Sequence, residues 1–522
     1  MRSILRLHRR VPGYCLTAIL AAATLVASQA QQPLAPEVSA ALDRISADSL
    51  RGHLSFIASD QLEGRNTPSR GLDLAAEYIA AQFRRAGLEP AGDNGYFQTA
   101  MFAVSELDPS SFRLSVTSAT QEVNATASQV SFFFTQNWTI EPTAAAKIPF
   151  GDMAALDALA PGQLQGKVVL TEQPAISAAE TAQAAAANNF RRRLQMMRPA
   201  VIVYVDRGVT RSGDWGPARL IDLESRGTGN PDRAVAQNPE LRLYSPDAIA
   251  FYDAMPMGFG SATVSLRALA KERRVALRNV IGILRGSDPA LADSCVLLTA
   301  HYDHVGIRGT GQDNIFNGAN DNGSGTVSVI EIAAALATLK ERPKRSLVFM
   351  TVFGEEQGML GSRYYSRHPV FPIEKTVANI NLEQVGRTDS TEGPQVDNAT
   401  ITGFDFSDIG PIFESAGKRT GIAVYKHEGN SDSYFTRSDN VVLANLGVPA
   451  HSLTVAFNYP DYHRAGDHWD KIDYSNMARV DRMIALGLLM IANNPAPPRW
   501  NETHPRTAPF LRAWQDRHPE SR

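Results

Sequence analysis

The sequence predicts an α/β fold: a mixed, mostly parallel central sheet flanked by helices, with a β-rich domain inserted into it. From Asn279 onward, short apolar runs alternate with stretches in which apolar residues recur at helical spacing. Uninterrupted apolar runs are typical of strands that are covered on both faces of a sheet. Residues 106–272 differ, because short β-like runs are separated there by Ala-, Gly- and Pro-rich stretches and no His occurs.

The predicted elements can be followed in chain order. A strongly amphipathic stretch from Gly71 to Leu88 predicts a helix, and Gly87 stands where a C-cap is expected. The β-like runs of the middle segment lie at 112–116, 167–171, 200–205 and 262–266. Beyond it, we expect strands at 279–284, 295–300, 346–353, 378–382 and within 441–453, and helices at 326–339 and 475–491.

Length, composition and charge limit the number of domains and the classes of partner that we expect for the chain. At 522 residues it is too long for one ordinary domain, so two or three are expected. Its 43% hydrophobic and 20% charged residues are ordinary for a globular protein. The formal net charge is -3, and beyond the N-terminus only the short run at 191–193 is basic, so we expect no nucleic-acid partner.

The first 30 residues have the composition of a targeting segment. Several Arg residues precede an apolar run at 15–27, and residues 28–30 (SQA) offer small side chains for cleavage. An apolar run of about 13 residues is too short to span a bilayer comfortably, so we expect a cleaved signal peptide and no stable membrane anchor. The mature protein is therefore expected to be periplasmic or secreted. Its single remaining cysteine, Cys295, is interpreted as a buried strand residue.

Candidate metal ligands and acid–base groups follow the ends of the predicted strands. Sites in such sheets form at the carboxyl ends of the strands, so these side chains are expected to lie close together. They are His301 and Asp303 after the strand at 295–300, Glu355 and Glu356 after 346–353, Glu383 after 378–382, and Asp321 near the start of the helix at 326–339.

These residue types suit a hydrolytic centre with two zinc ions. Imidazole and carboxylate groups are ordinary Zn²⁺ ligands, and a carboxylate such as Asp321 can bridge two ions. Two metals together lower the pKa of a water molecule and polarise a carbonyl group. Of two adjacent glutamates, Glu356 can bind metal while Glu355 stays free as a general base. Asp303 is placed to hold the second imidazole nitrogen of His301.

Taken together and in this order, the motifs resemble the zinc-dependent exopeptidase family that contains bacterial leucyl aminopeptidases, glutamate carboxypeptidase II and glutaminyl cyclase. They read HYDH from His301, GANDNGSG from Gly318, GEEQGMLGS from Gly354, NLEQVGR from Asn381 and YHRAGDHWDKID from Tyr462. The resemblance covers about residues 46–105 and 275–492. The middle segment, with GQLQGKVVL, is similar to a protease-associated domain.

The resemblance implies a phosphorylase/hydrolase-like zinc peptidase fold that holds two Zn²⁺ per chain. One ion would be bound by His301, Asp321 and Glu383, and the other by Asp321, Glu356 and His463. Glu355 would be the general base, Asp303 would orient His301, and Tyr462 could donate to the oxyanion. The resemblance also implies a cis peptide bond between Asp321 and Asn322. Glu383 departs from the family pattern, because the best-known members have Asp at this position.

The resemblance also divides the chain. We expect a signal peptide at 1–30, the N-terminal part of the peptidase domain at 31–105, a protease-associated-like insert at 106–272, the di-zinc catalytic domain at 273–495 and a C-terminal tail at 496–522 that lies on the surface or frays.

The predicted function is that of an exported metallo-exopeptidase, an aminopeptidase, which hydrolyses the N-terminal peptide bond of a peptide substrate with a metal-bridged water. One alternative is a carboxypeptidase or dipeptidase of the glutamate carboxypeptidase type. That activity needs basic pocket residues, for which Arg363, Arg387, Arg437 and Arg464 are available. Glutaminyl cyclase activity and a non-catalytic peptide-binding role are the others. His304 and His468 lie close to ligands without an assigned role, and the sequence leaves the oligomeric state open.

Overall fold

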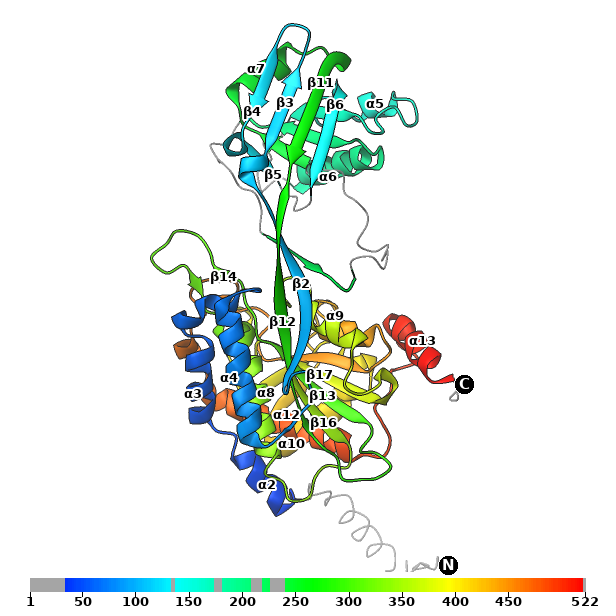
Figure 1. Ribbon diagram of the computed structural model, residues 1–522. Helices are drawn as coiled ribbons and strands as arrows, with labels where there is room; N and C mark the ends of the chain where they lie inside the picture. Colours follow the sequence, from blue (N-terminus) through cyan, green and yellow to red (C-terminus); the bar gives the residue numbers. More distant parts are fainter. Residues whose placement is uncertain (1–32, 133–136, 173–180, 208–217, 226–239, 520–522) are drawn as a thin grey trace, which may run out of the picture. The chain divides into compact units, whose positions relative to one another are not determined.

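The computed structural model describes residues 33–132, 137–172, 181–207, 218–225 and 240–519. It divides into two compact units (Figure 1): unit 1 comprises Met1–Thr99 and Arg278–Arg522, and unit 2 comprises Ala100–Leu277. The sequence placed the limits of the insert at residues 106 and 272. The predicted signal peptide, residues 1–30, lies outside the described residues. Within them, no helix combines the length and the apolar character needed to cross a membrane.

A mixed sheet forms the centre of unit 1, as the sequence predicts. Its four middle strands are parallel and follow the order β22 (Ala450–Thr454), β17 (Thr376–Leu382), β13 (Cys295–His301) and β16 (Ser346–Val352). Antiparallel strands adjoin them on both sides, namely β12 (Ala270–Leu284) next to β16 and β20 (Asn398–Ile401) next to β22. Every residue of β13 and β16 is buried, which explains their uninterrupted apolar sequences.

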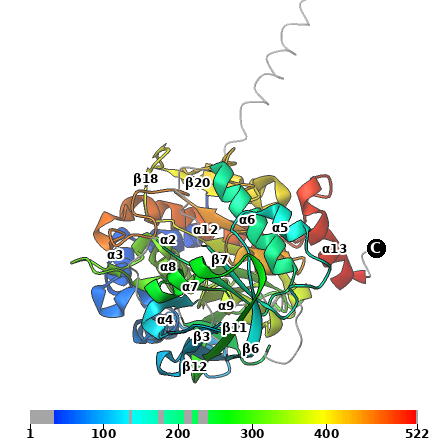
Figure 2. The same cartoon turned by 90° about the horizontal axis from the view of Figure 1, so that it is seen from above.

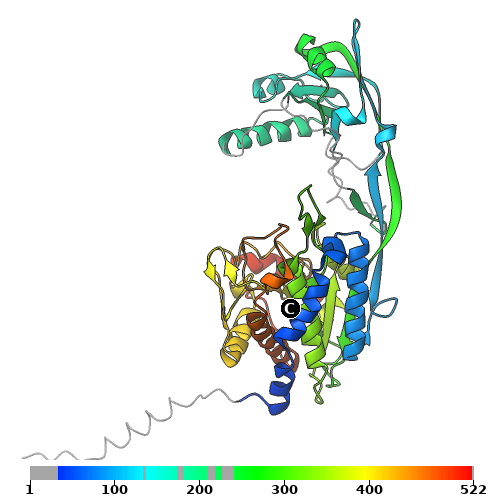
Figure 3. The ribbon, with the colours of Figure 1, turned by 90° about the vertical axis from the view of Figure 1, so that its left-hand side faces the viewer.

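Helices cover this sheet. The helices α8 (Gly325–Leu336) and α12 (Tyr474–Asn493) pack against β13 and β16, and α9 (Leu360–Arg367) and α11 (Asn440–Ala444) pack against β16 and β17 respectively. Near the N-terminus, α3 (Ala47–Ile57) and α4 (Arg70–Ala86) run side by side (Figures 1 and 3) and contact α8. The predicted cap of α4 is confirmed, because Gly87 ends the helix with a φ of 74°.

Unit 2 has its own sheet and core. Among the described residues its sheet has eight strands, in the order β4-β3-β11-β6-β7-β8-β10-β5. Of these, β4 is Glu122–Ala125, β5 is Val130–Phe132, β6 is Trp138–Lys147 and β10 is Glu240–Leu243. The predicted β-like runs correspond to β3 (Arg113–Thr117), β7 (Val168–Glu172), β8 (Val201–Val205) and β11 (Gly258–Ala268). Side chains of β7 and β8 alternate between two core clusters, one of which includes residues of α5 (Met153–Asp157) and α6 (Thr181–Met196). These two helices lie side by side (Figure 2).

The C-terminal segment differs from the predicted tail. Residues Ala508–Arg517 form the helix α13, and both Trp500 and Phe510 are buried. The indole of Trp500 donates to the carbonyl of Gly447 at 2.8 Å and stacks on Phe510. The Pro- and Arg-rich composition predicts exposure, but these aromatic side chains anchor the segment to unit 1.

A buried arginine ties the N-terminal helices to the loops above the sheet. Arg65 is fully buried, and its guanidinium donates to the backbone carbonyls of Ile57, Tyr302, Asn317 and Gly318 at 2.5–2.9 Å. No carboxylate of the described residues lies within ion-pair distance of it. Burial lowers the pKa of Arg65 to about 10, and the fields of Asp303, Asp467 and Asp321 oppose that shift. The guanidinium therefore stays charged at neutral pH.

We expect Arg65→Met to destabilise the protein by about 3 kcal/mol or more, because four buried carbonyls lose a charged donor. Chemical denaturation of the variant would measure the loss. The matched control is Arg85→Met, which removes an exposed Arg from the end of α4 and should change stability by less than about 0.5 kcal/mol. Equal stability of the two variants would contradict the role assigned to Arg65.

Candidate metal centre

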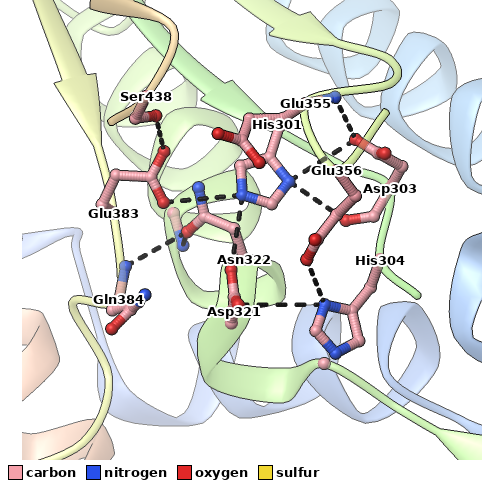
Figure 4. Close-up of polar contacts among 12 residues, drawn as sticks. His301, Asp303, His304, Asp321, Asn322, Glu355, Glu356, Glu383, Gln384 and Ser438 are labelled. Atoms are coloured by element: carbon pink, nitrogen blue, oxygen red, sulfur yellow. Dashed lines mark hydrogen bonds and ion pairs between the residues drawn. The ribbon is translucent and has the colours of Figure 1, made fainter. Parts of the chain in front are cut away.

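The predicted site residues meet at the carboxyl ends of β13, β16 and β17 (Figure 4). His301 is the last residue of β13, and Glu383 directly follows β17. Glu355 and Glu356 lie in the loop after β16. Asp321 lies in the tight turn that leads into α8, and the peptide bond between Asp321 and Asn322 is cis, as the resemblance implies. Parallel strand ends thus bring together groups that are far apart in the sequence.

The first ligand group consists of His301, Asp321 and Glu383. The Nε2 atom of His301 lies 3.4 Å from Oδ1 of Asp321 and 3.5 Å from Oε2 of Glu383. One ligand atom from each residue lies within 4.8 Å of the others, which is close enough to share one metal ion. Imidazole nitrogen and carboxylate oxygen suit Zn²⁺.

The second ligand group consists of His304, Asp321, Glu356 and His463. Nε2 of His463 lies 2.9 Å from Oδ2 of Asp321 and 3.2 Å from Oε1 of Glu356. Nδ1 of His304 lies 3.0 Å from the same oxygen of Glu356. The two oxygens of Asp321 therefore face different ligand groups, which is the geometry of a bridging carboxylate. Sequence reasoning left His304 without a role, although the HYDH motif contains it.

The charges of the site favour cations. Burial opposes ionisation of Asp321, but contacts with His301 and His463 outweigh it and hold the pKa of this carboxyl far below its ordinary value. Burial and the charge of Asp321 would raise the pKa of Glu356, yet His304 and His463 lower it to about 2. Contacts with Asp321 and Glu356 in turn raise the pKa of His463 to about 10. The same negative field would stabilise divalent ions.

Glu355 belongs to neither ligand group. Burial raises the pKa of its carboxyl well above the ordinary value, with the neighbouring carboxylates of Asp439, Glu383 and Glu356 adding to the shift and His301 opposing it. Its side chain lines the same pocket as the ligand groups. A carboxyl of raised pKa beside a metal centre is suited to taking up and returning a proton.

Asp303 acts on two neighbours. Its carboxylate accepts from the backbone N–H of Glu355 at 3.1 Å and from the hydroxyl of Thr67 at 3.1 Å. Nδ1 of His301 lies 3.5 Å from this carboxylate and 3.1 Å from the backbone carbonyl oxygen of Asp303, which makes the hydrogen bond. Asp303 thus fixes both the His301 ring and the backbone of Glu355.

Two supporting interactions were missed by sequence reasoning. Buried Asp467 accepts from the backbone N–H groups of Asn320 and Asp321 at 3.0–3.1 Å and from the hydroxyl of Tyr459 at 3.0 Å. The Oε1 atom of Glu383 accepts from Asn381 at 3.0 Å and from Ser438. Its other oxygen is left to face His301. The sequence did contain a signal for both residues, because Asp467 lies in the YHRAGDHWDKID motif and Asn381 lies in the NLEQVGR motif.

A pocket of about 190 Å³ opens beside the two ligand groups. Tyr462 lines it, is 44% exposed, and stacks on His463 at 4.2 Å between ring centroids. The lining also includes Tyr434, Arg437 and Phe457. Of the other arginines considered from the sequence, Arg387 pairs with Asp389 and Asp461 and does not line this pocket.

Comparison with known proteins agrees with this geometry, because residues 279–487 match the model of Peptidase family M28. The chain contains a peptidase family M28 domain. That domain holds every residue of the two ligand groups.

Relatives of the M28 domain are distant and match over part of their length. A probable zinc metalloprotease of Leptosphaeria maculans is 27% identical over 194 residues, which are 37% of this chain and 43% of that protein. Aminopeptidase YwaD of Bacillus subtilis is 33% identical over 126 residues, 24% of this chain and 25% of that protein. A probable glutamate carboxypeptidase of Arabidopsis thaliana is 23% identical over 260 residues, 46% of this chain and 34% of that protein. The chain thus spans less than half the length of each.

Solved structures show the fold. The aminopeptidase from Aneurinibacillus sp. strain AM-1 has a TM-score of 0.53 at 17% identity, covering 90% of this chain and 97% of that chain. BSAP, a zinc aminopeptidase from Bacillus subtilis, has a TM-score of 0.50 at 17% identity, covering 87% of this chain and 97% of that chain. These likenesses show that the M28 domain shares the fold of such proteins.

We expect Asp467→Ala to weaken zinc binding by about 10–100-fold, because the turn that carries Asp321 loses its buried acceptor. Competition with a chromophoric chelator would measure the affinity, and circular dichroism would check that the variant is folded. Asp470→Ala is the matched control, since Asp470 is exposed in the same loop and holds no ligand. A folded Asp467→Ala variant with unchanged zinc affinity would contradict the role of Asp467.

Proposed function

We propose that this protein is a zinc-dependent metallo-exopeptidase that removes residues from the amino terminus of peptides. The observation that carries the proposal is the pair of ligand groups that share Asp321 beside Glu355, a carboxyl outside both groups. Peptide hydrolysis needs a polarised carbonyl, an activated water and a proton carrier. The donor set and the free carboxyl together can supply all three.

In this proposal each ligand group holds one Zn²⁺. The buried ring nitrogen Nδ1 of His304 and the oxygen Oε1 of Glu356 have no hydrogen-bond partner among the described residues, which fits a metal ion as the missing partner. When bound, the two ions would polarise the scissile carbonyl and lower the pKa of a water molecule.

The residues around the metal positions have separate tasks. Glu355 takes the proton of the attacking water and returns it to the leaving amine, which suits its raised pKa. Asp303 holds the backbone of Glu355 and so keeps that carboxyl in place. Tyr462 is proposed to donate its hydroxyl to the charge that develops on the carbonyl oxygen. Glu355 and other carboxylates line the pocket, and the free amino terminus of a peptide can bind near them.

Export is part of the same proposal. The composition of residues 1–30 supports a cleaved signal peptide and a periplasmic or secreted mature protein.

A second candidate function has one observation in its favour. Arg437 lines the pocket, and its guanidinium lies 4.1 Å from the ring centroid of Tyr434. Among the described residues no carboxylate lies within ion-pair distance of it. A free guanidinium can bind a substrate carboxylate. That would suit a carboxypeptidase acting on acidic dipeptides with the same metal centre.

We expect Glu355→Gln to lower kcat by about 10²–10⁴-fold while the zinc content stays at the wild-type level, because the proton carrier is lost and both ligand groups remain. Rates on aminoacyl-anilides and metal analysis by mass spectrometry would test this. The matched control is Glu414→Gln, which alters a partly exposed Glu of α10 (Ile409–Thr420) that pairs with Lys418, and it should leave both values unchanged. Wild-type kcat in Glu355→Gln would contradict the role of Glu355.

Substrates with free and blocked amino termini separate the two candidate functions. We expect aminoacyl-anilides to be cleaved and their N-acetylated equivalents to resist, because the proposal places the amino group against carboxylates. Cleavage of N-acetylated acidic dipeptides instead, with KM raised about tenfold or more by Arg437→Gln, would indicate the carboxypeptidase. Arg363→Gln is the control, since that side chain does not line the pocket. A zinc-loaded protein that cleaves neither class would favour a binding protein.

A further inference from the structure

His304 has an unusual environment for a buried histidine. Its side chain is fully buried, and neither Nδ1 nor Nε2 has a hydrogen-bond partner among the described residues. Buried polar groups are nearly always hydrogen-bonded, since desolvation without compensation is costly. A metal ion bound at Nδ1 would be a partner for that nitrogen.

The position of the ring points to that partner. Nδ1 of His304 lies 3.0 Å from Oε1 of Glu356 and 4.0 Å from Oδ2 of Asp321 (Figure 4). The first distance would fit a hydrogen bond, but the two atoms are not aligned for one. Two ligand atoms that bind the same metal ion also lie close together. In a tetrahedral zinc site, two ligand atoms that each lie about 2.1 Å from the ion are about 3.4 Å apart.

His463 completes the same arrangement. Its Nε2 lies 2.9 Å from Oδ2 of Asp321 and 3.2 Å from Oε1 of Glu356, so the same two oxygens face both imidazoles. The rings of His304 and His463 are 5.4 Å apart and nearly perpendicular. Four ligand atoms, two nitrogens and two oxygens, therefore lie within 4.8 Å of one another.

The fold holds His304 in this orientation. A Cβ atom at Gly318 would lie 2.4 Å from Cγ of His304, so the ring packs directly on the backbone of Gly318. Gly318 has a φ of 58°, which favours glycine at this position. The backbone N–H of His304 donates to the carbonyl of Arg65, whose guanidinium in turn donates to the carbonyl of Gly318. The ring is thus positioned before any ligand arrives.

We propose that His304 is a fourth protein ligand of the second metal position, which makes the two positions chemically unequal. The inference rests on the proposed two-zinc function. The second position would have four protein ligands, one more than the first. The first position would keep three protein ligands and a place open to substrate. The second ion is then expected to bind more tightly and to load first.

X-ray absorption at the zinc edge of the wild-type, zinc-loaded mature chain tests the coordination directly. We expect three imidazole ligands in total for the two zinc ions, supplied by His301, His304 and His463. If His304 does not bind, only two imidazole ligands are expected. Two imidazoles for two ions would overturn the role of His304 and leave the proposed function standing. A wild-type chain that binds no zinc would overturn both.

The variant His304→Gln tests the affinity, with mass spectrometry and chelator competition as readouts. We expect one of the two zinc ions to bind at least tenfold more weakly, and the other to keep its affinity. His468→Gln is the matched control, because His468 is partly exposed and contacts Asp313 instead of the ligand groups. Wild-type affinity for both ions in a folded His304→Gln variant would overturn the inference. If that variant does not fold, the absorption measurement on the wild-type chain still decides it.

Discussion

The shared carboxylate of Asp321 is the constraint on which the rest of the site depends. Its two oxygens face two different groups of donors, so the turn that carries it must be placed to within tenths of an ångström. Carboxylates also crowd around it, and each of them would be costly to bury without compensating positive charge. The histidines of both ligand groups supply part of that compensation, as the lowered pKa values of Asp321 and Glu356 indicate. A site of this charge is stable only if it is held rigidly and filled by cations.

Buried charged groups outside the ligand set provide the rigidity. Asp467 accepts from two successive backbone N–H groups at the Asp321 turn. Arg65 binds the carbonyls of Asn317 and Gly318, which directly precede that turn, and the carbonyl of Tyr302, which directly follows β13. Asp303 holds the backbone of Glu355. Each of these side chains acts on backbone atoms, so it positions a ligand or the proposed base without competing for the metal. This division gives each of these buried charges a structural task.

The sequence predicted the strands and the main site residues well, for a physical reason. A strand such as β13, covered on both faces, leaves a continuous apolar run, and the first polar residue after it marks a strand end. His301, Glu355 and Glu383 were found in this way. The sequence could not reveal that His304 faces Glu356, because that contact depends on the backbone of Gly318 and the rotamer of a residue 52 positions away. The composition of the C-terminal segment predicted an exposed tail, which the structure does not show. Trp500 and Phe510 are buried there, and the segment contains a helix.

The longer side chain at position 383 can be understood from its surroundings. An aspartate here would bring its carboxylate closer to the end of β17, whereas the extra methylene of Glu383 carries the carboxylate farther out, to a place where its two oxygens meet different partners. One oxygen accepts from Asn381 and Ser438, and the other faces Nε2 of His301. Ser438 precedes Asp439 and follows Arg437 in the loop that lines the pocket. Glu383 therefore connects the first ligand group to a loop that lines the pocket. A change of residue in that loop would alter the orientation of a ligand as well as the shape of the pocket.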